Sequence, residues 1–383
     1  MTVADVCAAV EELAPPGWAY EWDRSGLAVG SPAAGVSRVL VALTLTRDVL
    51  DAALRAGAEM IVCHHPPLWE PLRALRTDDA ATRLLLDLAR PSPADDPAQS
   101  RRFPDGIACY AAHTNLDVAP GGVNAILAGR LGLIDTAPLL PVPHATQVKL
   151  VTFVPESHLA AVHEAVCTRG AGVIGDYTHC SFSSPGVGSF LPGERTQPFS
   201  GRRRRVNEEP ERRFEVLVPE ARLAVVLDAL RAAHPYEEVA YDLVPLANPD
   251  PALGLGVRGR LETPQPLAAF AAFVRTALKV SHLRMVRPPG QAMNRRIRTV
   301  GVLGGSGGGE IAAMPHDLDV LVTGDVRYHD AFQARDKGLT VIDAGHAGTE
   351  KWAVPAIARH IRRRCRGLRV STYLEPDVFH LIS

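Results

Sequence analysis

Three short apolar runs in this chain end in histidine and are followed by a turn or a helix-like stretch. The first run, residues 58–63, ends at His64 and His65 and is followed by two prolines. Proline disfavours helical backbone in the residue before it, so this run is predicted to be a strand that presents both imidazoles at its carboxyl end. Open α/β sheets bind their ligands at that edge. The pattern therefore predicts an α/β fold with a site where strands end.

The other two runs repeat the order of strand, histidine and, four residues later, a carboxylate. One leads to His113 and Asp117, and the other leads to His346 and Glu350. Together with the histidine pair these residues exceed what one tetrahedral zinc ion needs, and they suit two adjacent divalent ions bridged by a carboxylate and a water. Either histidine–carboxylate pair alone is equally consistent with a helix cap. The three strand-end matches together favour metal binding.

These motifs, taken in order, resemble a known family. The matching segments are Trp22–Leu27, Cys63–Pro67, His113–Asp117 and Gly345–Glu350. They are similar to motifs of the GTP cyclohydrolase I type 2 homologues, also called Nif-three-like proteins, and the resemblance covers roughly residues 1–140 and 250–383. Arg24 departs from the family, which often has a small polar residue there, and this difference bears on substrate contacts.

The resemblance implies a dinuclear metal protein that assembles into a toroidal homohexamer. The implied ligands are His64, His65, Asp117, His346 and Glu350, with His113 close by as a candidate sixth group. Nitrogen and oxygen ligands without a thiolate admit zinc, iron, manganese, cobalt or nickel, so the sequence leaves the metal open.

Other polar residues are candidates for roles around two such ions. His113 and His329 are candidates for moving protons during catalysis. Asp325 and Asp343 are candidates for orienting a ligand imidazole. Ser306 lies in a glycine run between a predicted strand and a predicted helix, where backbone amides can hold a substrate or a phosphate. A tight turn explains that run equally well, and it lacks the lysine of a P-loop.

The middle of the chain has a different pattern, strand–helix–strand followed by strand–helix–strand. It extends over residues 142–249 and separates the two halves of a metal-binding α/β domain, 1–141 and 250–383. The order predicts a ferredoxin-like α+β insert, a compact unit that can enter through a loop whose ends lie close together. The His234–Val239 segment and a predicted turn at Gly186–Phe190 resemble the PII/CutA-like inserts of some family members. We expect roles in assembly, access to the metals or small-ligand sensing.

Composition restricts partners and location. The formal net charge is −1, so no overall basic field attracts nucleic acid, and nucleic acid is not an expected partner. No apolar stretch approaches the roughly 20 residues that a membrane span needs. The 6 cysteines include no Cys-x-x-Cys spacing and are expected to be reduced thiols. We therefore expect a cytoplasmic protein without membrane contact, with a small-molecule substrate or ligand.

Two functions are consistent with the sequence. The first is a metal-dependent hydrolase that cleaves a phosphoester or a nucleotide-like substrate, since two divalent ions activate water and five or six ligands leave open positions on them. The second is a non-catalytic metal-binding ring, a metal chaperone, ligand sensor or scaffold whose insert recruits ligands or partners. The sequence alone leaves open whether the protein is an enzyme.

Overall fold

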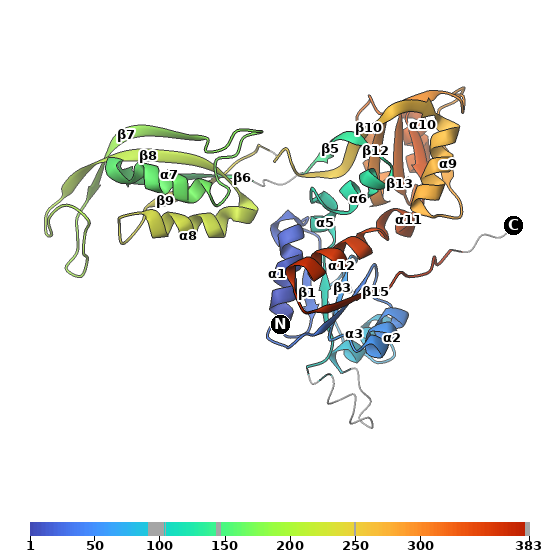
Figure 1. Cartoon of the computed structure of the whole chain (residues 1–383), viewed down its shortest axis with the longest axis horizontal. Helices are drawn as coiled ribbons and strands as arrows, with labels where there is room; N and C mark the ends of the chain where they lie inside the picture. Colours follow the sequence, from blue (N-terminus) through green and yellow to red (C-terminus); the bar gives the residue numbers. More distant parts are fainter. Residues whose placement is uncertain (91–102, 104, 143–146, 249, 380–383) are drawn as a thin grey trace. The chain divides into compact units, whose positions relative to one another are not determined.

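The computed structural model describes residues 1–90, 103, 105–142, 147–248 and 250–379. They form two compact units, one from residues 1–141 and 251–383 and the other from residues 142–250. Residues 143–146 and 249, at the predicted borders of the insert, lie outside the described residues. Figure 1 shows the elements of both units, and no described helix is long and apolar enough to cross a membrane.

The first unit contains a five-stranded sheet in which four neighbouring strands are parallel. Its order is β1 (Gly26–Val29), β4 (Ala108–Ala111), β3 (Met60–Cys63), β2 (Arg38–Ala42) and β15 (Arg369–Thr372), with β1 antiparallel to β4. Helices α1 (Val3–Leu13) and α12 (Ala353–Arg364) pack on one face, and α2 (Arg47–Ala56) and α3 (Ala80–Ala89) pack on the other. Met60 and Val62 are buried in the first layer, whereas Ile61 and Cys63 are buried in the second. Burial on both faces explains why this run is apolar throughout.

A six-stranded mixed sheet joins the two sequence halves within the same unit. Its order is β11 (Arg284–Val286), β14 (Thr340–Asp343), β13 (Val320–Gly324), β12 (Arg296–Ser306), β10 (Gly254–Pro266) and β5 (Ile134–Pro141). Strand β5, before the insert, pairs antiparallel with β10, after the insert. Strands β12, β13 and β14 are parallel, so their carboxyl ends meet at one edge.

Helices cover both faces of the six-stranded sheet. Helices α6 (Val123–Arg130) and α9 (Leu267–Leu278) pack on one face, and the 3₁₀ helix η4 (Gly307–Ala313) and α10 (Tyr328–Lys337) pack on the other. Shorter helical segments are η1 (Pro16–Trp18), α5 (Thr114–Val118) and α11 (His346–Glu350). The helix predicted after the glycine run is a 3₁₀ helix, a tighter form than the α-helix, and it begins within the run, at Gly307.

The second unit has the element order β-α-β-β-α-β. It comprises β6 (Gln147–Pro155), η2 (Glu156–His158), α7 (Leu159–Cys167), β7 (Ser181–Phe190), β8 (Asn207–Pro219), η3 (Glu220–Arg222), α8 (Leu223–Ala233) and β9 (Tyr241–Pro245). The sheet order is β7-β8-β6-β9, and every neighbouring pair is antiparallel. Helices α7 and α8 pack on one face of this sheet (Figure 1). Leu150 and Phe214 are buried beneath them.

One local prediction in this unit is wrong. The segment Gly186–Phe190 is not a turn, because it belongs to β7 and pairs in register with β8. Strand β7 is at the edge of its sheet. Edge strands tolerate the glycine and proline residues that suggested a turn.

Candidate metal centre

Six ionisable side chains that the sequence singled out lie together in the first unit, where strands of its two sheets end. They are His64 and His65 directly after β3, His113 and Asp117 after β4, and His346 and Glu350 in α11 after β14. Within the described part of the chain, two groups of three have one ligand atom each within 4.8 Å of the others. They are His64 with His65 and Glu350, and His64 with His113 and Asp117.

The Glu350 carboxylate lies between the imidazoles. Its Oε2 atom is 2.9 Å from His65 Nε2 and 2.9 Å from His346 Nε2, and these two nitrogens are 3.2 Å apart. Its Oε1 atom is 3.6 Å from His64 Nε2, which is in turn 3.6 Å from Asp117 Oδ1. The two oxygens of one carboxylate therefore face two different sets of ligand atoms.

The Nδ1 atom of every imidazole in the cluster is held by a neighbouring group. The partners are Ala112 O for His64 (2.8 Å), Thr44 Oγ1 for His65 (2.7 Å), Asp23 Oδ1 for His113 (2.8 Å) and Asp325 Oδ2 for His346 (2.8 Å). Such contacts set the orientation of each ring and leave Nε2 as the atom for a ligand or a proton. Metal-binding histidines are usually held in this way.

Two atoms at the centre of the cluster have no hydrogen-bond partner within the described residues. They are His64 Nε2 and Asp117 Oδ1, and both are buried. An unsatisfied buried polar atom costs free energy of about 1–3 kcal/mol, and more when it is charged. A bound cation would satisfy both atoms at once, so the residues present fit a metal ion.

The charges of the cluster also favour a bound cation. Burial opposes protonation of His64, but the carboxylates of Asp117 and Glu350 outweigh it and raise the pKa of His64 to about 9. Burial raises the pKa of Asp117 to about 6, and the imidazoles around Glu350 hold the pKa of that carboxyl well below its usual range despite burial. Two adjacent carboxylates thus create a buried negative potential that a divalent ion would neutralise.

The glycine run brings β12 against this cluster. At Gly305, which has a φ of +69°, an added Cβ atom would lie 2.1 Å from Glu350 Oε1. The amide of Gly305 donates to Thr349 Oγ1 at 2.9 Å. Glycine is therefore required for the close approach, and Ser306 follows as an exposed residue at the end of β12.

The remaining predicted residues occupy different places. Asp343 is buried and accepts hydrogen bonds from the amides of Gly345 (2.9 Å) and Val326 (3.1 Å), so it holds the backbone before His346 and not an imidazole. His329 is exposed in α10, where its ring packs edge-on against Tyr328 with centroids 5.7 Å apart. Among the described residues, no hydrogen bond or ring contact joins His329 to the cluster.

Two residues of the site, Trp22 and Asp23, lie in the Trp22–Leu27 motif but were given no role from the sequence, and Thr44 and Trp69 were not singled out. Asp23 and Thr44 orient imidazoles, and Trp22 and Trp69 form an aromatic wall beside His113. The indole rings stack with centroids 6.5 Å apart, and Trp69 meets the His113 ring edge-on at 5.1 Å. Trp22 is 56% exposed and Trp69 is 50% exposed. Thr44 carried a usable signal, because it lies two residues after the end of β2, as His65 does after the end of β3.

Replacing Asp325 with asparagine is expected to weaken metal binding about tenfold or more while leaving the fold intact. The substitution removes the charge that holds His346 Nδ1, and asparagine tolerates the backbone φ of +51° at this position. Competition with a chromophoric chelator measures the affinity. Asp336→Asn, at an exposed position of α10, is the control. An Asp325→Asn affinity equal to that of the control would show that His346 needs no such support.

The fold and the cluster define a class of protein: an α/β protein with a candidate metal site where the strands of two sheets end. The chain belongs to the DUF34/NIF3 family, whose profile, described as Duf34/NIF3 (NGG1p interacting factor 3), matches residues 1–375. The predicted family membership and the α/β class are therefore confirmed.

Relatives of known sequence and structure cover almost the whole chain. A GTP cyclohydrolase 1 type 2 homolog of Halalkalibacterium halodurans is 40% identical over 337 residues, which is 88% of this chain and 86% of the relative. The Bacillus subtilis protein of the same name is 37% identical over 356 residues, 93% of this chain and 90% of the relative. The crystal structure of a Bacillus cereus protein related to NIF3 has a TM-score of 0.82 at 36% identity, covering 100% of this chain and 99% of that one.

Proposed function

We propose that the cluster binds two divalent metal ions bridged by Glu350. In this arrangement His65, His346 and Glu350 would hold one ion, and His64, Asp117 and Glu350 would hold the other. The observation that supports it is the position of the Glu350 carboxylate, whose two oxygens face separate sets of ligand atoms. The buried, unpartnered His64 Nε2 and Asp117 Oδ1 add to that support. Zinc, iron, manganese, cobalt and nickel all suit these ligands.

The reaction proposed is hydrolysis of a phosphoester or a nucleotide-like substrate. When bound, divalent ions polarise a substrate oxygen and make water a nucleophile near neutral pH. His113 is the better placed candidate for proton transfer, because Asp23 fixes its Nδ1 and its ring centroid is 5.3 Å from that of His64. His329 is exposed in α10 and would serve only a substrate that extends to that helix. Ser306, at the end of β12, is the proposed contact for a phosphate.

The aromatic wall supports a substrate that carries a flat ring. Half-exposed indoles expose apolar surface to water, and each gains about 1–3 kcal/mol when a nucleobase stacks on it. Trp22 and Trp69 lie beside His113, so a ring stacked there would place its attached phosphate or its own ring atoms near the cluster. Relatives named GTP cyclohydrolase 1 type 2 homolog make a purine nucleotide the first compound to test.

A non-catalytic metal-binding ring is the second candidate. The burial of two of its ligands favours it, because His64 is 0% exposed and Glu350 is 4% exposed, and structural metal sites are closed to water. We further propose, from the family resemblance, a cytoplasmic homohexamer. In this proposal residues 142–249 form a ferredoxin-like insert of the PII/CutA type, consistent with its β-α-β-β-α-β order.

Assays of the metal-reconstituted chain with GTP and with glycerol 3-phosphate test the proposed hydrolase activity. We expect turnover that depends on added metal and falls at least about 100-fold in His113→Ala, with metal content unchanged. Turnover unaffected by this substitution would remove His113 from the mechanism. Two bound ions with no turnover on a wider panel of nucleotides and phosphoesters would favour the non-catalytic ring.

Replacing both Trp22 and Trp69 with alanine is expected to raise KM for a ring-bearing substrate about 30-fold or more. A ring-free phosphoester should keep its KM, since it makes no stacking contact. Steady-state kinetics on both substrates measures the difference. Trp69→Phe, which keeps an aromatic ring, should raise this KM much less than the double alanine variant does. Leu75→Ala, which removes another exposed apolar side chain, should leave KM unchanged. Equal losses on both substrates would contradict a stacking role.

A further inference from the structure

A cavity in the second unit, which belongs neither to the cluster nor to its wall, has the dimensions of a small-molecule site. Its volume is about 620 Å³, within the range of 300–1,000 Å³ that is common for ligand pockets. It lies on the open face of the β7-β8-β6-β9 sheet, opposite α7 and α8. Phe153 and Arg213 are paired across β6 and β8 on this face, and their neighbour Phe214 points into the core instead.

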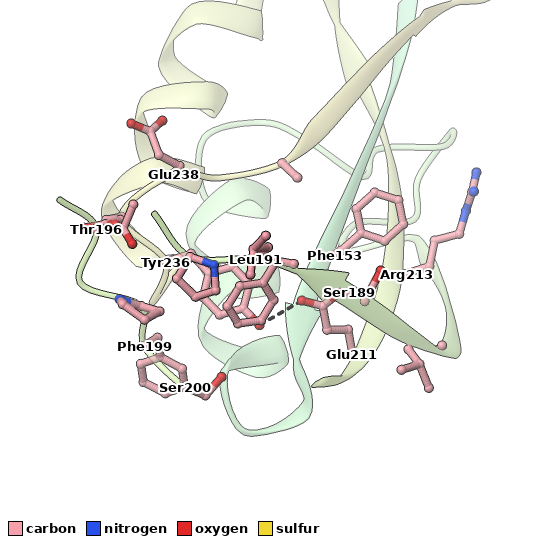
Figure 2. A pocket seen from close by; sticks show the side chains of 18 of the residues that line it. Phe153, Ser189, Leu191, Thr196, Phe199, Ser200, Glu211, Arg213, Tyr236 and Glu238 are labelled. Atoms are coloured by element: carbon pink, nitrogen blue, oxygen red, sulfur yellow. Dashed lines mark hydrogen bonds between the residues drawn. The ribbon is translucent and has the colours of Figure 1, made fainter. Parts of the chain in front are cut away.

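Aromatic rings line the cavity from three parts of the chain. Phe153 comes from β6, Phe190 and Phe199 come from the end of β7 and the segment after it, and Tyr236 follows α8. Figure 2 shows Phe153 at one side of the cavity and Tyr236 with Phe199 at the other. The Phe199 and Tyr236 ring centroids are 6.1 Å apart, and Phe199 is 52% exposed. A ligand between these rings would cover apolar surface that now faces water.

A carboxylate lies between the aromatic sides. Glu211 accepts a hydrogen bond from Tyr236 Oη at 2.8 Å, drawn as a dashed line in Figure 2. Gly188 provides the space for it, because an added Cβ atom there would lie 2.2 Å from Glu211 Oε2. The Glu211 carboxylate is therefore packed into the lining of the cavity and does not rotate freely into solvent.

The charge of the lining is negative. Glu211, Glu237 and Glu238 line the cavity, and Arg213 is its one basic lining residue among those described. The guanidinium of Arg213 is paired with Glu215, at 2.8 Å between Nε and Oε1, so its charge is already balanced. Burial and then the neighbouring Glu211 raise the pKa of Tyr236 above its usual range.

We propose that this cavity binds an organic cation, an ammonium group with an alkyl or aromatic body. Cations are attracted to the faces of aromatic rings, and this attraction is strongest where the cation is desolvated. Glu211 supplies the opposite charge, while the exposed side chains of Val187 and Leu191 give the apolar body a surface to cover. An anion of the same size would face the same rings but meet three carboxylates. The site is separate from the proposed metal centre and does not depend on its occupancy.

Calorimetric titration of the full chain with benzyltrimethylammonium tests the proposal, with phenylacetate and benzyl alcohol as anionic and neutral probes of similar size. We expect the cation to bind at least about tenfold more tightly than either probe. Glu211→Gln and Tyr236→Ala should each weaken its binding about fivefold or more. Glu220→Gln, an exposed carboxylate in η3 outside the cavity, should leave it unchanged.

Three results would overturn this assignment. One is equal affinity for the cation and for phenylacetate. Another is cation binding that survives both Glu211→Gln and Gly188→Val, the second of which fills the space beside the carboxylate. The third is absence of binding by any probe together with self-association that Phe199→Glu disrupts in analytical ultracentrifugation, which would assign the cavity to contact with a second copy of this chain.

Discussion

Glu350→Gln is expected to lower the metal content of the reconstituted chain from about two ions to fewer than about one, with affinity reduced at least about 100-fold. Glu350 is the residue whose oxygens face both ligand sets, His65 and His346 on one side and His64 on the other. Glutamine has nearly the same shape but no negative charge, so the imidazoles would hold a cation without the carboxylate that balances it. Elemental analysis after gel filtration measures the ratio.

Two comparisons make that result specific. Glu70→Gln, at an exposed position after the histidine pair, should keep the full metal content. Circular dichroism should show that Glu350→Gln remains folded, because the isosteric side chain fills the same buried space. Full metal content in Glu350→Gln would contradict the proposed bridging role, whatever the activity of the variant.

Gly324→Ala is expected to destabilise the first unit by more than about 2 kcal/mol and to reduce its metal content. An added Cβ atom would lie 2.7 Å from Gly305 O, from the Gly345 carbonyl carbon and from His346 N. These are backbone atoms at the ends of β12 and β14, which cannot move apart without displacing the Glu350 and His346 side chains. The substitution should therefore lower both the stability of the first unit and its metal content.

Intrinsic tryptophan fluorescence during urea unfolding measures the stability of the first unit. All 4 tryptophans, Trp18, Trp22, Trp69 and Trp352, belong to the first unit, so their signal follows that unit. Gly309→Ala is the matched control, because nothing lies within 4 Å of an added Cβ atom there. If Gly324→Ala and Gly309→Ala unfold at the same urea concentration, the ends of β12, β13 and β14 do not need a glycine at position 324.

The strand-end ligands could be predicted because their signal is local. Parallel strands buried on both faces give apolar runs, and a histidine directly after such a run lies at the carboxyl edge of a sheet. Which of these ligands contact one another across the site has no such local signal. His65 and Glu350 are 285 residues apart in sequence. They follow strands of two different sheets, and only the tertiary arrangement of these sheets brings them together.

Residues that orient the imidazoles were harder to predict for a physical reason. A carboxylate or hydroxyl that contacts an Nδ1 atom needs only one hydrogen bond and follows no fixed spacing from its histidine. Asp23 lies 90 residues before His113, and Thr44 lies 21 residues before His65. Asp325 was predicted because it follows a strand in the same way as the ligands do, and it lies 2.8 Å from His346 Nδ1.

The cavity in the second unit was also beyond sequence reasoning. Its lining combines β6, the end of β7, the segment after it and the turn after α8, and these meet only through the antiparallel register of the sheet. The apolar and aromatic residues after β7 fit no helical or strand period. Their exposure indicates a binding site only in combination with the Glu211–Tyr236 pair, which the fold places beside them.

Anomalous scattering from crystals of the zinc-reconstituted chain tests the central claim most directly. We expect two peaks about 3.5–4 Å apart, one beside His65 and His346 and the other beside His64 and Asp117, with Glu350 between them. A single peak, with Glu350 bound through one oxygen, would contradict the bridged pair. No peak between these side chains at saturating zinc would contradict the metal centre itself.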